Sequence, residues 1–218
     1  AGFEAQALLL PLLALVGAGG AMGLLALIAG RSGGIALFTL AGMMIASLAG
    51  ALTSLAISLS PNPFALSEIV TWLMGALVDR SWGDVRVALG PVVAGMALLL
   101  WAGRSLDSLT LGEETARSLG VDMRQLQWLM LTGVGLCVGA SVAVAGIIGF
   151  VGLVVPHLVR PLVGGQPSRL LIPSALAGAL LVVLADSLVR ILPSVSELRL
   201  GIAMSVLGTP FFLMLLWR

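Results

Sequence analysis

Asp186 and Arg190 have the clearest potential for chemistry, because both lie near the end of an apolar run and are four positions apart. On a helix this spacing brings the two side chains within pairing distance. A charge inside a membrane span indicates a functional site by default, whereas a pair at this spacing fits a structural ion pair equally well. The sequence leaves both interpretations open.

The sequence contains no recognisable catalytic motif. His157 is the single histidine, which excludes an HExxH metal site, and its place after Pro156 suits a helix-end hydrogen bond. Cys137 is the single cysteine, so no intrachain disulfide can form, and we expect it to pack among apolar residues. All eleven basic residues are arginine, and a chain without lysine has neither a Walker A loop nor a Schiff base. We expect no catalytic activity, no cofactor and no metal site.

The elements that hold these residues are predicted to be membrane helices. The chain of 218 residues is 59% hydrophobic and 10% charged, with a mean hydropathy of +1.14, whereas a soluble domain is about 25% charged. A net charge of +1 argues against nucleic acid as a partner. The apolar runs are continuous rather than alternating, which excludes a transmembrane barrel. The prediction is an all-α, polytopic helical bundle in a lipid bilayer.

Seven apolar runs are candidate spans, since a membrane helix needs about 20 apolar residues. They are 7–29, 35–60, 87–103, 125–145, 146–163, 170–191 and 200–217. Between the fourth and the fifth, the small residues 142–149 predict a tight turn. Of the eleven arginines, seven fall on one side (Arg31, Arg104, Arg117, Arg124, Arg160, Arg169 and Arg218), which the positive-inside rule places in the cytoplasm. Small residues four apart (Gly19 and Gly23, Ala46 and Gly50, Gly135 and Gly139) predict close helix packing.

The segment 60–83 is predicted to lie outside the cytoplasm. After the breaker at 60–63, Ser67 can cap a short helix that runs to Gly75. Such a helix is too short to span a bilayer, so we expect a re-entrant or interfacial segment with Trp72 and Trp82 at headgroup depth. A simple surface helix is the alternative.

The cytoplasmic loop 104–124 is predicted to contain a short capped helix. Glu113 and Glu114 favour its start, Arg117 can pair with either, and Gly120 fits a left-handed helix end. Asp122 with Gln125 resembles a capping box for the next span. We interpret the helix as a rigid knob that docks a partner, with a solvated connector as the alternative.

Four ordered motifs resemble one family, the permeases of ABC importers for iron–siderophore, haem and cobalamin. They are GEETARSLG at 112–120, GFVGLVVPHLVR at 149–160, LADSLVR at 184–190 and GTPFFLMLL at 208–216. The resemblance covers the whole chain as one permease domain (1–218), similar to the C-terminal two-thirds of the family domain. Arg199 departs from it, because the family usually has proline there.

The resemblance implies ten helices per subunit, a second permease subunit (homodimer or heterodimer), two separate ATPase subunits and an extracytoplasmic substrate-binding protein, in the inner membrane. It implies that the cytoplasmic knob couples to the ATPase through Gly112, Glu113, Glu114, Ala116, Arg117 and Gly120. It places Arg190 at the position that contacts the binding protein, whereas Arg199, Arg80 and Arg86 are docking candidates from charge alone. Ser32, Gly33 and Gly34 fall at the cytoplasmic gate, with a plain turn as the alternative.

The expected activity is ATP-driven import by alternating access. An ion-driven secondary transporter would require acidic residues or histidine at mid-membrane, and Asp186 lies near a helix end. A membrane fragment without transport is the other alternative. The family's ten helices lead us to expect roughly 100 residues and three more spans of about 20 residues before Ala1.

Overall fold

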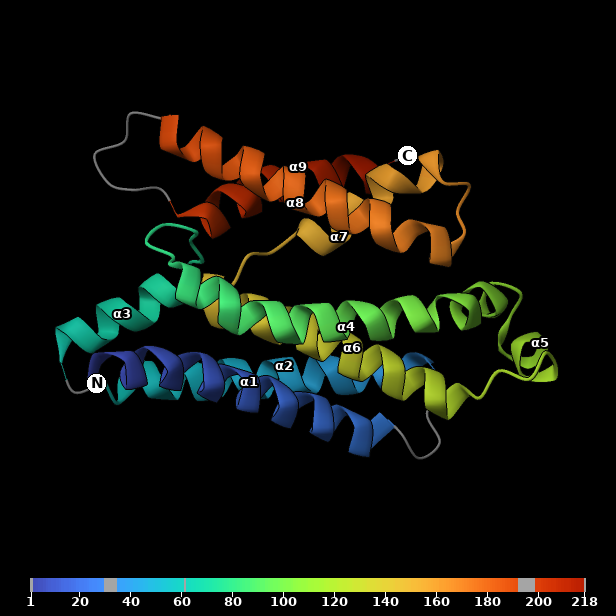
Figure 1. Cartoon of the computed structure of the whole chain (residues 1–218), viewed down its shortest axis with the longest axis horizontal. Helices are drawn as coiled ribbons and strands as arrows, with labels where there is room; N and C mark the ends of the chain where they lie inside the picture. Colours follow the sequence, from blue (N-terminus) through green and yellow to red (C-terminus); the bar gives the residue numbers. More distant parts are fainter. Residues whose placement is uncertain (1, 30–34, 61, 192–198, 218) are drawn as a thin grey trace. The chain divides into compact units, whose positions relative to one another are not determined.

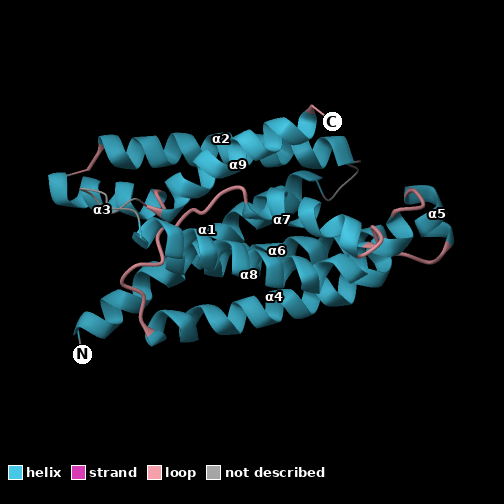
Figure 2. Cartoon of the chain, turned by 90° about the horizontal axis from the view of Figure 1, so that it is seen from above, coloured by secondary structure: helices cyan, strands magenta, loops and turns pink. Residues whose placement is uncertain are grey.

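The computed structural model describes residues 2–29, 35–60, 62–191 and 199–217 (Figure 1). These residues form helices joined by loops, with no strand among them, which confirms the predicted all-α class (Figure 2). The helices are α1 (Gly2–Ala29), α2 (Ile35–Ser58), α3 (Pro63–Leu73), α4 (Trp82–Leu109), α5 (Glu113–Ser118), α6 (Met123–Ala145), α7 (Val151–Val159), the 3-10 turn η1 (Arg160–Leu162), α8 (Pro167–Ile191) and α9 (Leu200–Leu216).

Within the described residues, four helices are long and apolar enough to cross a membrane. They are α2 from Leu37 onward, α4, α6 and α8, with 22 to 28 residues each. Helices α1 and α9 coincide with the first and last predicted spans and contain shorter apolar stretches, Leu12–Ile28 and Leu200–Pro210. The chain is therefore a multi-pass membrane protein.

The helices divide into two compact units. The first unit comprises Ala1–Thr71, Trp82–Leu99 and Asp122–Val144. The second unit comprises Trp72–Ser81, Leu100–Val121 and Ala145–Arg218. The first unit thus holds α1, α2, most of α3, the first part of α4 and nearly all of α6. The second holds the last turns of α4 together with α5, α7, η1, α8 and α9.

Small residues let α6 approach both α4 and α1 in the first unit. A Cβ atom added at Gly95 of α4 would lie 2.6 Å from Sγ of Cys137 and 2.7 Å from the carbonyl oxygen of Gly133. A Cβ added at Gly139 would lie 2.9 Å from the Cβ of Ala18 in α1. Membrane helices without a bulky residue at such points gain contact through close packing. The packing predicted for the Gly135–Gly139 stripe is confirmed.

The glycines of the other two predicted small-residue stripes make no close helix contact within the described part of the chain. A Cβ at Gly19, Gly23 or Gly50 would meet nothing within 4 Å among the described residues. Gly19 and Gly23 instead line an apolar cavity of about 330 Å³, together with residues of α4 and α6 such as Pro91 and Trp128. Close contact was therefore the wrong expectation for these three glycines.

The core of the second unit joins α8 to α9. Ala185, Leu200 and Met204 are buried there, and Leu181 and Val151 pack against them. Helix α7 lies along α8, and α9 contacts both helices. This packing positions the last turns of α8, where Asp186 and Arg190 lie.

Three backbone segments of the second unit meet at Gly75, Gly146 and Gly201, which we call the glycine junction. The N–H of Gly201, in the first turn of α9, donates to the carbonyl oxygens of Met74 (3.1 Å) and Gly75 (3.3 Å). A Cβ added at Gly201 would overlap the carbonyl oxygen of Met74, and one added at Gly75 would overlap that of Ile147. Gly75 and Gly146 also have positive φ angles of 62° and 73°, which glycine adopts without a steric penalty.

The fifth predicted span, 146–163, is wrong as a full crossing. Residues 146–150 are not helical, and α7 has only 9 residues. At 1.5 Å per residue such a helix covers roughly 14 Å, about half the hydrocarbon core of a bilayer. Positive φ angles at Gly146 (73°) and Phe150 (65°) prevent a helix from running through this stretch. Helix α6 also continues to Ala145, so the turn begins later than the predicted residue 142.

Two other helix boundaries in the structure differ from the predicted ones. Helix α3 begins at Pro63 rather than after Ser67, because the Asn62 carbonyl accepts the N–H of Leu66 (3.2 Å) and proline suits the first helical position. Helix α4 continues past the predicted end at Gly103 as far as Leu109.

Candidate coupling helix and outer arginines

Helix α5 is the predicted short helix of the 104–124 loop. Glycines with positive φ flank it, Gly112 at 99° and Gly120 at 86°. Glu113 and Glu114 occupy its first turn, where the helix dipole favours negative charge. Nη2 of Arg117 lies 2.7 Å from Oε1 of Glu113, so the i,i+4 pair forms with Glu113. The local structure predicted for this stretch is confirmed.

Backbone hydrogen bonds close the end of α5. The N–H of Gly120 donates to the carbonyl of Arg117 and that of Val121 to the carbonyl of Ala116, both at 3.0 Å. These bonds satisfy carbonyls that a helix end leaves unpaired, and the left-handed glycine lets the chain turn back. The helix is short but has a defined end.

Asp122 caps the start of α6, as its spacing to Gln125 predicted. Its Oδ1 accepts the backbone N–H of Arg124 (2.8 Å) and of Gln125 (3.2 Å). Two of the N–H groups without an intrahelical partner at the start of α6 are thereby satisfied.

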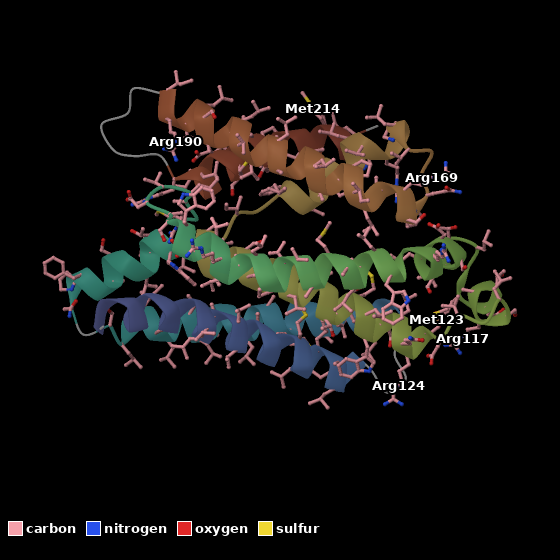
Figure 3. All side chains as sticks on the ribbon, viewed as in Figure 1. Arg117, Met123, Arg124, Arg169, Arg190 and Met214 are labelled. Atoms are coloured by element: carbon pink, nitrogen blue, oxygen red, sulfur yellow. The ribbon has the colours of Figure 1, made fainter. Side chains whose placement is uncertain are left out.

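One side of α5 is buried and the other is exposed. Ala116 is completely buried, whereas the side chains of Glu113 and Arg117 are 44% and 63% exposed. Leu111 and Leu119, on either side of the helix in sequence, are also exposed. Figure 3 labels Arg117 on this helix. The predicted coupling residues therefore form one knob with a charged pair and two apolar side chains at its surface.

The Asp186–Arg190 pair forms near the end of α8. Nε of Arg190 lies 2.7 Å from Oδ2 of Asp186, and the two side chains are 54% and 17% exposed, respectively. Figure 3 shows Arg190 near the end of α8 and Arg169 near its start. The carboxylate is largely covered while the guanidinium keeps an exposed edge, so an ion pair within the helix leaves Arg190 open to a further contact.

The other docking candidates belong to both units. Arg80 and Arg86 are exposed, but Arg80 belongs to the second unit and Arg86 to α4 in the first. The carbonyl of Arg199 accepts the N–H groups of Ile202 (3.1 Å) and Ala203 (3.3 Å) at the start of α9. A docking surface shared by all four arginines stays a prediction. The predicted gate residues Ser32, Gly33 and Gly34 lie outside the described residues.

A contact between α4 and α8 was not anticipated from the sequence. The backbone N–H of Ser168 donates to Oδ1 of Asp107 (2.8 Å), and the Ser168 hydroxyl donates to Oδ2 (2.5 Å). One signal for it exists: Gln166, before Pro167 at the start of α8, is not a preferred N-cap residue. A helix start without a local cap needs an acceptor from elsewhere in the chain.

The described side chains offer no metal-binding cluster. No group of three or more His, Cys, Asp or Glu side chains comes together in that part of the chain. His157 lies exposed on α7. Exposed ion pairs of the described residues lie at the α5 knob and near the end of α8.

Comparison with known proteins identifies the family. The model of the FecCD transport family matches residues 2–218. The vitamin B12 import system permease protein BtuC of Vibrio cholerae is 42% identical over 180 residues, which are 82% of this chain and 54% of that protein. The hemin transport system permease protein HmuU of Yersinia pestis is 39% identical over 186 residues (85% and 55%). The Fe(3+) dicitrate transport system permease protein FecD of Escherichia coli is 40% identical over 158 residues (72% and 49%).

A solved structure shares the fold. It is an inward-facing conformation of a metal-chelate type ABC transporter, with a TM-score of 0.82 and 35% identity over 90% of this chain and 63% of that one. The chain spans about half the length of the curated relatives that it matches. With a family model that covers residues 2–218 and relatives near 40% identity, this chain belongs to the FecCD transport family.

Proposed function

We propose that the chain forms part of the membrane pathway of an ATP-driven importer for a chelated metal or a corrinoid. The relatives near 40% identity are named for vitamin B12, hemin and ferric dicitrate, each of which contains a metal chelated by an organic ligand. Hydrolysis of ATP takes place on separate ATPase subunits, since the chain has no lysine for a Walker A loop. A second permease subunit and an extracytoplasmic binding protein complete the assembly.

The observation that carries the proposal is the α5 knob. A six-residue helix between two long apolar helices has a defined end, a buried anchor at Ala116 and an exposed Glu113–Arg117 pair. Fixing the backbone costs about 1–2 kcal/mol per residue, and the order kept at this cost supports a role for α5 beyond that of a simple connector. A rigid knob is what an ATPase subunit requires in order to transmit movement to membrane helices.

The test replaces Glu113, Glu114 and Arg117 together by alanine in the permease that carries this sequence. Uptake of cobalamin, hemin and ferric dicitrate into proteoliposomes is measured together with ATP hydrolysis and with ATPase binding. We expect the triple variant to insert into the membrane, to lose ATPase binding and to lose uptake. Arg160→Ala, which removes an exposed arginine on the same predicted side of the membrane, is the matched control.

Normal coupled uptake by the triple variant would overturn the role of α5. Uptake that follows an ion gradient without ATP would overturn the proposed function itself and favour a secondary transporter.

A further inference from the structure

We propose that Asp107 is a positioning residue that fixes the coupling helix α5 to the start of α8, so that movement of α5 is passed directly to α8. The inference rests on the proposed function of α5 as the docking site of the ATPase. It adds a residue that lies outside the docking surface and carries the movement onward. Asp107, α5 and α8 all belong to the second unit.

The first step is the cap that Asp107 provides. Helix α8 begins at Pro167, which has no N–H, so the N–H of Ser168 is the first donor without an intrahelical partner. Asp107 accepts this N–H at 2.8 Å and the Ser168 hydroxyl at 2.5 Å. Hydrogen bonds to a carboxylate are stronger than neutral ones, and a negative charge suits the positive end of a helix.

The second step is the close approach that aligns the two helices. Gly103 lies one turn before Asp107 on the same face of α4. A Cβ added at Gly103 would lie 3.3 Å from the Cβ and 3.4 Å from the Cα of Ser168. The end of α4 therefore touches the start of α8 through a glycine and is bonded to it through a carboxylate one turn further along.

The third step is the connection from Asp107 to α5. The carbonyl of Asp107 accepts both the N–H (3.2 Å) and the hydroxyl (2.7 Å) of Thr110. The N–H groups of Leu111 and Gly112 then donate to the carbonyls of Ser108 and Leu109, both at 3.1 Å. Consecutive hydrogen-bonded turns leave the backbone little conformational freedom between Asp107 and the first residue of α5.

Two hydrogen bonds join Asp107, at the start of the hydrogen-bonded connector 107–112, to the first turn of α8. Among the side chains of the described residues, Asp107 alone makes this link. Helix α8 extends from Pro167 to Ile191 and carries the Asp186–Arg190 pair near its other end. A displacement of α5 thus reaches a membrane helix without passing through a flexible loop.

The test compares three variants in the complete transporter. Asp107→Ala removes both acceptors. In Asp107→Asn the amide oxygen still accepts the Ser168 N–H, and the amide N–H group can donate to the Ser168 hydroxyl. Ser108→Ala is the matched control, because the Ser108 hydroxyl bonds only within its own helix, to the carbonyl of Arg104 at 3.3 Å.

The first readout is the amount of ligand imported per ATP hydrolysed. We expect Asp107→Ala to bind the ATPase normally, since the α5 surface is intact, and to lower this ratio severalfold. We expect Asp107→Asn to restore most of the ratio and Ser108→Ala to leave it unchanged. An altered fold would lower ATPase binding as well, so preserved binding separates a loss of positioning from a loss of structure.

The second readout does not depend on the ATPase. Spin labels at Ser118→Cys in α5 and Leu176→Cys in α8, in a Cys137→Ser background, report the distance between the two helices by pulsed electron paramagnetic resonance. We expect a single narrow distribution for the parent protein and for Asp107→Asn, and a severalfold broader one for Asp107→Ala.

An unchanged distance distribution in Asp107→Ala would overturn the proposal, and so would a broadened distribution with an unchanged ratio of import to hydrolysis. If the triple variant of the α5 knob imports normally, the docking role of α5, on which this inference rests, fails instead. The distance measurement alone then decides whether Asp107 holds α5 to α8.

Discussion

Replacement of Gly201 by alanine is predicted to destabilise the protein through the glycine junction. Gly201 lies in the first turn of α9, and its N–H donates to two carbonyl oxygens, those of Met74 and Gly75. An added Cβ would overlap the Met74 carbonyl oxygen and lie 2.8 Å from that of Ile147. Both obstacles are backbone atoms, so no side chain can rotate away to make room.

The expected cost follows from these contacts. Forcing a methyl group into a packed site typically costs about 1–3 kcal/mol. If α9 retreats to relieve the overlap, its N–H group loses both acceptors, at a cost of about 1 kcal/mol. Alanine recovers roughly 0.5–1 kcal/mol as the better helix former. We therefore expect the free energy of unfolding to fall by roughly 1–3 kcal/mol in total.

The measurement is equilibrium unfolding in mixed micelles titrated with sodium dodecyl sulfate. Gly152→Ala is the matched control, because Gly152 lies in α7 of the same unit and a Cβ there would meet nothing within 4 Å. That variant should be as stable as the parent or up to about 1 kcal/mol more stable. Equal unfolding free energies for the two alanine variants would refute the close backbone approach on which the reasoning depends.

Three further predictions concern the caps and the outer arginine. Asp122→Ala should lower the free energy of unfolding by about 1 kcal/mol through loss of the α6 cap, and Asp122→Ser should retain most of it, in the same titration; equal losses in both variants would contradict the capping role. Gly120→Ala should cost roughly 1–2 kcal/mol because of its φ of 86°, and amide hydrogen exchange in α5 should accelerate; unchanged exchange would count against a strained position. Arg190→Glu should weaken capture of the binding protein proposed above, most clearly at low ionic strength, because an exposed ion pair contributes roughly 0.2–1 kcal/mol; unchanged affinity there would leave Arg190 only as the structural partner of Asp186.

Features set by neighbours in sequence were predictable. The α5 helix depends on two glutamates in its first turn and on Gly120 at its end, and all of these lie within one short stretch. The Asp122 cap and the Glu113–Arg117 pair are likewise contacts across two to four residues. The apolar runs identified the long helices because length and composition alone decide whether a helix can span a bilayer.

Features set by distant segments were not predictable. Residues 146–163 are as apolar as a span, but Gly146, with its positive φ angle, lies where the backbone contacts the segment 72–76, and hydropathy does not register such a contact. The cap from Asp107 to Ser168 joins residues 61 positions apart. The start of α3 at Pro63 was missed for another reason, since its signal is local: Asn62 is as good an N-cap type as Ser67, and proline suits the first helical position.

The shortness of α7 leads to an expectation about how the protein enters the membrane during synthesis. A segment leaves the insertion machinery for lipid unaided when about 20 apolar residues pair all their backbone groups in one helix. Helix α7 has 9 residues and follows a non-helical stretch at 146–150. It packs along α8, which emerges from the ribosome only later. We therefore expect α7 to enter the bilayer together with α8, as one biosynthetic step.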